Sequence, residues 1–203
     1  MKMTGLDRAL LLITCLLAAY QIVVGIDDLS TVPIIAYTIA FGILLVAALL
    51  LIILGFDVLD TPVVVIVSTI IPLALSLGLV WEHLASYRAL YLIFTIIGFA
   101  AVILTRTVPM QNRERIPTIT IAIVHGIAGM TIFLLPIILS IQGMMKPAFA
   151  LVGLGGALIG IVGLLLSFFK TGKPLLSRDM KLRIFPGLLL LMTTFFVAGF
   201  KFG

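Results

Sequence analysis

The chain has 203 residues, of which 63% are hydrophobic and 10% are charged, and its formal net charge is +5. A soluble domain of this size cannot keep so much apolar surface from water, so the composition excludes a soluble protein. Lysine and arginine occur in short segments between apolar runs, where orientation in a membrane explains them, so the positive charge does not indicate a nucleic-acid partner. The partners expected instead are the lipid bilayer and other membrane subunits.

Seven apolar runs approach the length of about 20 residues that a helix needs to cross a bilayer. They lie at roughly Leu10–Ile26, Pro33–Leu54, Pro62–Trp81, Tyr87–Thr105, Pro117–Ile141, Ala148–Phe169 and Pro186–Phe200. The connecting segments are short, so sequential helices are expected to pack antiparallel. The sequence therefore predicts an all-α, multi-pass integral membrane protein, with one compact bundle of about seven helices over residues 1–203. In a prokaryote, its expected location is the plasma membrane.

The distribution of basic residues orients this bundle, because cytoplasmic loops carry an excess of lysine and arginine. One side has only Arg88, Lys146 and Lys201. The other side has the remaining ten: Lys2, Arg8, Arg106, Arg113, Arg115, Lys170, Lys173, Arg178, Lys181 and Arg183. We expect the N-terminus inside and the C-terminus outside.

A weak internal repeat relates two pairs of spans. Pro72-Leu-Ala-Leu-Ser76 aligns with Pro136-Ile-Ile-Leu-Ser140 at an offset of 64 residues, since 136 − 72 = 64. This pattern predicts that spans 3–4 and 5–6 are copies of one helical hairpin, although chance similarity between apolar segments also explains it. Pro72 and Pro136 are expected to kink their helices. Ser76 and Ser140, one turn later, are placed to satisfy the freed backbone groups or to bond a neighbouring helix.

Prolines and glycines also indicate helix ends and helix contacts. Pro62, Pro117 and Pro186 are predicted to open helices, because a proline in the first turn loses no hydrogen bond. Gly156 and Gly160 form a small-xxx-small pattern that predicts close helix packing.

His125 is the clearest candidate site residue. It lies about eight residues inside its span, or ~12 Å deep at 1.5 Å per residue. An ionisable residue at such a depth indicates function, and an imidazole can ligate haem, bond a quinone or relay a proton. The alternative is a neutral imidazole bonded to a backbone carbonyl or to a threonine such as Thr120 or Thr131.

The second candidate is the polar segment Trp81–Arg88 at the predicted outer face, which contains the only other histidine. Glu82 and His83 are metal ligands by type, as are the nearby Asp27 and Asp28, but their spacing matches no compact motif. A Glu82–Arg88 ion pair and an interfacial aromatic belt are the structural alternative. The depths of His83 and His125 differ by roughly 20 Å, so the two cannot share one haem.

These features support three hypotheses. The leading one is a non-catalytic accessory or anchoring subunit of a larger membrane complex, related to electron transfer through quinone or haem. A small transporter or channel, with a path past the kinked third and fifth spans and His125, is the first alternative. The second is a membrane enzyme that acts on a lipid at the outer face through Glu82 and His83.

Overall fold

The computed structural model describes residues 3–27, 29–108, 115–167 and 178–203, and all regular secondary structure in these segments is helical. The elements are α1 (Gly5–Val24), α2 (Thr31–Leu54), η1 (Phe56–Asp60), α3 (Pro62–His83), η2 (Ala85–Tyr87), α4 (Arg88–Thr107), α5 (Ile116–Ile141), η3 (Pro147–Phe149), α6 (Ala150–Ser167) and α7 (Arg178–Phe202). Within these described segments, six helices are long and apolar enough to span a membrane, and a shorter apolar helix, Pro147–Gly160, lies within the η3–α6 region. The prediction of a multi-pass helical membrane bundle is confirmed at this level.

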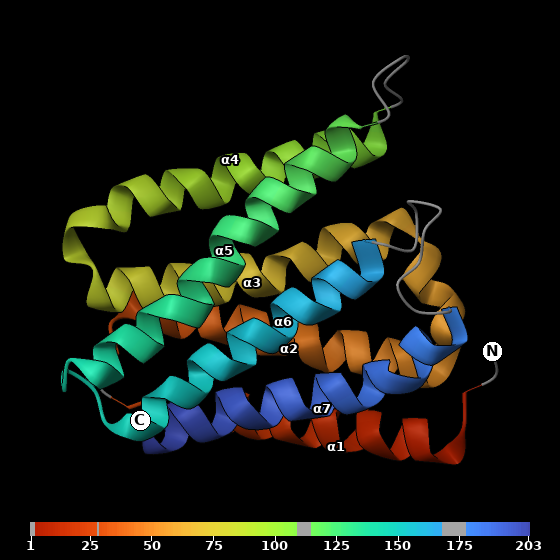
Figure 1. Cartoon of the computed structure of the whole chain (residues 1–203), viewed down its shortest axis with the longest axis horizontal. Coiled ribbons are helices and arrows are strands. Elements are labelled where there is room, and N and C mark those ends of the chain that lie inside the picture. Colours follow the sequence, from red (N-terminus) through yellow and green to blue (C-terminus); the bar gives the residue numbers. More distant parts are fainter. Residues whose placement is uncertain (1–2, 28, 109–114, 168–177) are drawn as a thin grey trace.

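Among the described residues, six α-helices contact one another in a closed ring. The remaining helix, α4, contacts α3 and α5 and lies at the edge of the bundle (Figure 1). Around the ring, each helix contacts the next in the order α1, α2, α3, α5, α6 and α7, and α7 contacts α1 to close the ring. The main hydrophobic core lies within this ring and takes no residue from α4. A second, smaller core joins α4 to α3 and α5 through Leu73, Val102, Val124 and Ala128. The bundle is therefore a closed six-helix ring with one peripheral helix.

The first helix begins earlier than the apolar run predicts. Thr4 is the N-cap, its hydroxyl accepts from the Asp7 backbone N–H, and the Asp7 carboxylate accepts from the Thr4 backbone N–H at 2.8 Å. This reciprocal capping box satisfies N–H groups that have no partner within the helix. Asp7 is buried, so the acid serves the helix end.

The prediction that Pro186 opens the last helix is wrong. α7 begins at Arg178, and Pro186 lies inside the helix. Leu182, Phe185 and Leu189 are all buried in the main core, and their spacing continues the helical period on both sides of the proline. This packing offsets the hydrogen bond that the proline ring removes. By contrast, Pro62 and Pro117 lie in the first turns of α3 and α5, as predicted.

The interior prolines of the predicted repeat lie within uninterrupted helices, Pro72 in α3 and Pro136 in α5. The Ser76 hydroxyl donates to the Pro72 carbonyl at 2.6 Å, and the Ser140 hydroxyl donates to the Pro136 carbonyl at 2.9 Å. Each serine thus bonds the carbonyl of the proline itself, and not the carbonyl four residues earlier that the proline leaves free. The kinks and the duplication of the two hairpins stay predictions.

Glycines allow α6 to approach α5 closely. A Cβ at Gly156 would lie 2.9 Å from the α5 backbone, and a Cβ at Gly153 would lie 2.6 Å from the Phe133 carbonyl oxygen. Gly160 faces open space, so the second glycine of this contact is Gly153. Close backbone approach of this kind is how small residues stabilise helix pairs in lipid.

Candidate functional site

An apolar groove lies where α4 diverges from α5. Its volume is about 570 Å³, within the usual range for small-molecule sites. The lining comes from α3, η2, α4 and α5, and comprises Val80, Leu84, Tyr87, Tyr91, Gly126, Ile127, Met130, Thr131, Leu134, Leu135 and Ile138. In Figure 1, α4 and α5 lie close where α4 ends and α5 begins, and separate toward the opposite end. We call this hollow the α4–α5 groove.

Local packing explains where the groove opens. A Cβ at Gly98 would lie 3.2 Å from the Val124 side chain, so α4 and α5 touch closely there. Gly126 faces open space and lines the groove. From Gly126 to Ile138 the groove follows α5 for ~18 Å at 1.5 Å per residue. That length is more than half of the hydrocarbon core of a bilayer, which is about 30 Å thick.

Three hydroxyl groups meet within the groove region. The Tyr91 hydroxyl of α4 donates to Thr131 Oγ1 of α5 at 3.2 Å, and the Ser76 hydroxyl of α3 also faces Tyr91. The Thr131 hydroxyl donates to the Ile127 carbonyl at 2.9 Å. Thr131 lies about midway between Gly126 and Ile138, so these hydroxyl groups form a polar point part-way along a groove that is otherwise lined by hydrocarbon.

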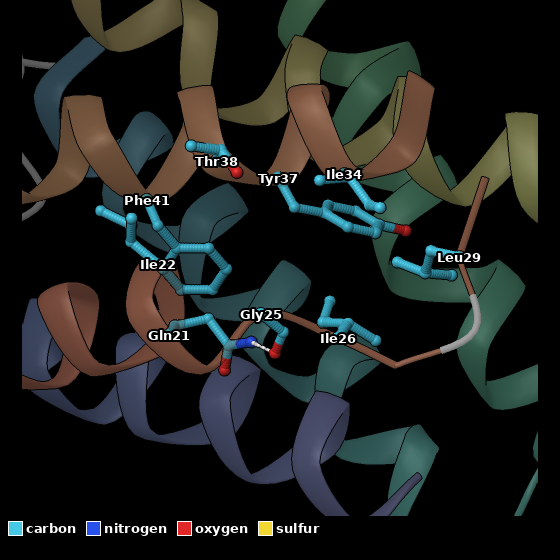
Figure 2. A pocket seen from close by; sticks show the side chains of 9 residues that line it. All are labelled: Gln21, Ile22, Gly25, Ile26, Leu29, Ile34, Tyr37, Thr38 and Phe41. Carbon is cyan, nitrogen blue, oxygen red and sulfur yellow. Dashed lines mark hydrogen bonds between the residues drawn. The ribbon is translucent and has the colours of Figure 1, made fainter. Parts of the chain in front are cut away.

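A second, much smaller pocket lies between the end of α1 and the start of α2 (Figure 2). Its volume is about 20 Å³, which is room for about one water molecule. Gln21 is buried at its edge, and its side-chain amide donates to the Gly25 carbonyl at 2.8 Å (Figure 2). Tyr37 and Thr38 line the side formed by α2. A pocket of this size does not admit an organic ligand.

The predicted outer polar segment does not form one loop, because Trp81, Glu82 and His83 complete the last turn of α3. Glu82 accepts a hydrogen bond from the Ser30 hydroxyl at 3.2 Å. The His83 ring packs edge-on against Phe149, with their ring centroids 5.4 Å apart. The side chains of Glu82 and His83 are therefore engaged with α2 and η3, respectively, and join neighbouring parts of the bundle.

Arg88 likewise has a structural role at this end. Its Nε donates to the Trp81 carbonyl, and its guanidinium lies 5.8 Å from the centroid of the Trp81 ring. These contacts join the start of α4 to the end of α3. The aromatic alternative predicted for this segment fits this geometry better than a Glu82–Arg88 ion pair.

No group of three or more potential metal ligands comes together among the described residues. Asp27 is exposed, and Asp28 lies outside the described residues. The predicted metal site at Asp27, Asp28, Glu82 and His83 gains no support from the described part, and it stays a prediction.

His125 lies in α5 with the backbone of Ile121, one turn earlier, close to its imidazole, and its buried Nδ1 makes no well-formed hydrogen bond to any residue that the structure describes. Thr131, one of the two predicted threonine partners, bonds Ile127 and Tyr91 instead. The Nε of Arg106, in the last turn of α4, is also buried without a partner. His83 is the last residue of α3, whereas His125 lies ~24 Å along α5 from the end of that helix at Ile141. The two histidines therefore belong to different parts of the bundle.

Comparison with known proteins finds no matching protein family, no similar curated protein and no matching solved structure.

The residues of the α4–α5 groove were not identified from the sequence. Tyr91 and Thr131 are 40 positions apart, and each lies alone in an apolar span. Only the contact between α4 and α5 brings them together. A tyrosine one turn inside a span, away from the usual interfacial position, is the one local signal that could have drawn attention to this site.

Proposed function

We propose that this protein is a non-catalytic membrane subunit that binds a lipophilic molecule in the α4–α5 groove. The observation that carries the proposal is the groove itself. It is about 570 Å³ in volume, is lined almost wholly by hydrocarbon and has a few hydroxyl groups part-way along its length. Ligand sites typically combine an apolar lining with a small number of placed polar groups. Its open side exposes Ile127, Met130 and Leu134, so a ligand dissolved in the bilayer can enter laterally.

The arrangement of basic residues supports an orientation for this site. With the N-terminus inside, η2 and the start of α4 lie at the outer face, so Ile138 marks the outer end of the groove, and the Tyr91–Thr131 hydroxyl groups lie between it and Gly126 at the inner end. If the source is prokaryotic, the membrane is the plasma membrane. A molecule with a small polar head and a long apolar tail, such as a quinone or a lipid, matches this depth profile.

The role as an accessory or anchoring subunit belongs to the same proposal. The residues that line the groove carry no carboxylate, histidine or cysteine, so they offer no general base to activate the tyrosine and threonine hydroxyls and no set of metal ligands. A binding site without catalytic groups suits a protein that presents a lipophilic molecule to a partner. Purification from native membranes tests this role. Co-purification of a defined partner is expected, and a stable lone monomer would contradict it.

A transport path past His125 is the second candidate, and one observation favours it. Gly126 lines the inner end of the groove, and the buried Nδ1 of the adjacent His125 makes no well-formed hydrogen bond within the described part of the chain. The groove is apolar along its length, which favours a lipophilic ligand over a polar solute. The lipid enzyme at the outer face has no comparable support, because Glu82 and His83 contact different elements.

A pair of glycine variants tests ligand binding directly. Gly126→Leu fills the groove without a clash, because a Cβ there meets no atom within 4 Å. Gly129→Leu is the matched control on the same helix, since a Cβ there also meets no atom within 4 Å and Gly129 does not line the groove. We expect Gly126→Leu to reduce the bound lipophilic molecule, measured by mass spectrometry of protein purified in native nanodiscs, by about tenfold, which corresponds to ~1.4 kcal/mol. Equal occupancy in the two variants would contradict the proposal.

A further inference from the structure

The hydrogen bonds of the hydroxyl groups around Tyr91 determine which ligand groups can bind there. A hydroxyl group has one hydrogen to donate and two lone pairs to accept with. Thr131 donates its hydrogen to the Ile127 carbonyl, and Tyr91 donates its hydrogen to Thr131. Ser76 donates to the carbonyls of Pro72 and Leu73, at 2.6 and 3.1 Å. The hydrogens of these three hydroxyls are therefore all engaged within the protein.

The group that remains available to a ligand is an acceptor. Tyr91 lines the groove, and after it donates to Thr131 its oxygen still has a lone pair to offer. In a site surrounded by hydrocarbon, water is not present to satisfy such a group. A ligand that brings an O–H gains a hydrogen bond at Tyr91 without breaking one. A ligand that brings only an acceptor must first displace the Tyr91–Thr131 bond.

Charge limits the ligand further. No lysine, arginine or histidine is among the residues that line the groove. A carboxylate or phosphate head would therefore lose its hydration without gaining an opposite charge. The head group that fits is neutral.

We propose that the α4–α5 groove selects a neutral amphipathic lipid with a hydroxyl head, either a long-chain alcohol or a phenol such as a reduced quinol. The hydroxyl donates to the Tyr91 oxygen, and the apolar tail follows α5 toward Gly126. This inference rests on the proposed function, since it names the class of ligand for the same groove.

A competition experiment with matched ligands tests the head-group preference. The full chain is placed in nanodiscs and labelled in the groove by a photoreactive hexadecane analogue. Hexadecanol, hexadecyl methyl ether and palmitate are then compared as competitors. One additional hydrogen bond is expected to make the alcohol about fivefold more effective than the ether, with palmitate weakest. Tyr91→Phe removes the acceptor and is expected to abolish the difference between alcohol and ether, whereas Tyr20→Phe, at an exposed tyrosine of α1, preserves it.

The outcomes separate this inference from the proposed function. Equal competition by alcohol and ether in the wild-type protein, or a preference that survives in Tyr91→Phe, would overturn the head-group inference while groove binding stands. Failure of the photoreactive probe to label groove residues would overturn the proposed function, and this inference with it. The wild-type comparison needs no variant, so it remains decisive if Tyr91→Phe fails to fold.

Discussion

The six-helix ring and the peripheral helix α4 have similarly apolar sequences but pack in different ways. Half of the most apolar window of α3 and of α7 is buried, whereas 11% of the corresponding window of α4 is buried. In water, an exposed apolar helix would be costly, but in a bilayer the lipid solvates it at little cost. Hydropathy thus predicts that α4 is a membrane span. It does not predict that α4 lies outside the ring, because that depends on how closely the helices pack.

Small residues mark the difference between the two regions. At the α6–α7 contact, a Cβ at Gly199 would lie 2.7 Å from the Val152 backbone nitrogen, and a Cβ at Gly155 would lie 2.7 Å from the Phe196 ring. Helix α4 has one glycine, Gly98, and it marks the place where α4 meets α5. Beyond that contact the two helices separate, and the α4–α5 groove begins.

A large side chain is expected to destabilise the protein more at a helix contact within the ring than on the open side of α5. Gly153→Leu places its Cβ against the Phe133 carbonyl oxygen, so overpacking should lower the free energy of unfolding by about 3 kcal/mol. Gly129→Leu, which enters open space, is the matched control and should change stability by less than about 0.5 kcal/mol. Thermal unfolding in detergent measures both. Equal stability of the two variants would mean that α6 does not pack on α5 in this way.

Replacing a phenylalanine by alanine should likewise lower the free energy of unfolding more in the main core than on α4. Phe196 is 1% exposed in the main core, so Phe196→Ala is expected to cost about 3 kcal/mol. Phe94, on α4, is only partly buried beside the smaller core, and Phe94→Ala should cost about 1 kcal/mol. Chemical denaturation of the two variants gives the comparison. A larger loss for Phe94→Ala would contradict the peripheral position of α4.

The smallest expected effect concerns His125, whose buried Nδ1 makes no well-formed hydrogen bond to a described residue. His125→Leu removes this unsatisfied group at nearly constant shape, so stability should rise by about 1 kcal/mol. The amount of lipophilic ligand bound should not change, because His125 does not line the groove. Mass spectrometry of the purified variant measures the ligand. A loss of ligand in His125→Leu would favour a path past this histidine instead.

The sequence predicts the helices better than it predicts their arrangement. Long apolar runs locate the helices because a bilayer imposes a minimum length, but helix ends depend on local contacts. The Thr4–Asp7 capping box could be read from the sequence ahead of Leu11, the first core leucine of α1. Pro186 was instead interpreted as a helix start because prolines are common there. The buried spacing of Leu182 and Phe185 was the stronger signal.

The candidate site shows the limit of sequence reasoning more sharply. The conspicuous polar residues, Glu82, His83 and Arg88, prove to contact neighbouring elements at the end of the bundle. The groove instead comes from Tyr91, Gly126 and ordinary aliphatic residues, whose role depends on the angle between α4 and α5. Such an angle follows from packing over the whole hairpin, and no short pattern encodes it.

An experimental structure of the full chain in nanodiscs of native lipid would test the central claim most directly. We predict that α4 diverges from α5 beyond Gly98, and that an elongated density fills the groove from Tyr91 to Gly126. The polar end of this density should lie within hydrogen-bonding distance of the Tyr91 hydroxyl. A structure in which α4 packs along the whole length of α5 and leaves no groove would contradict the account.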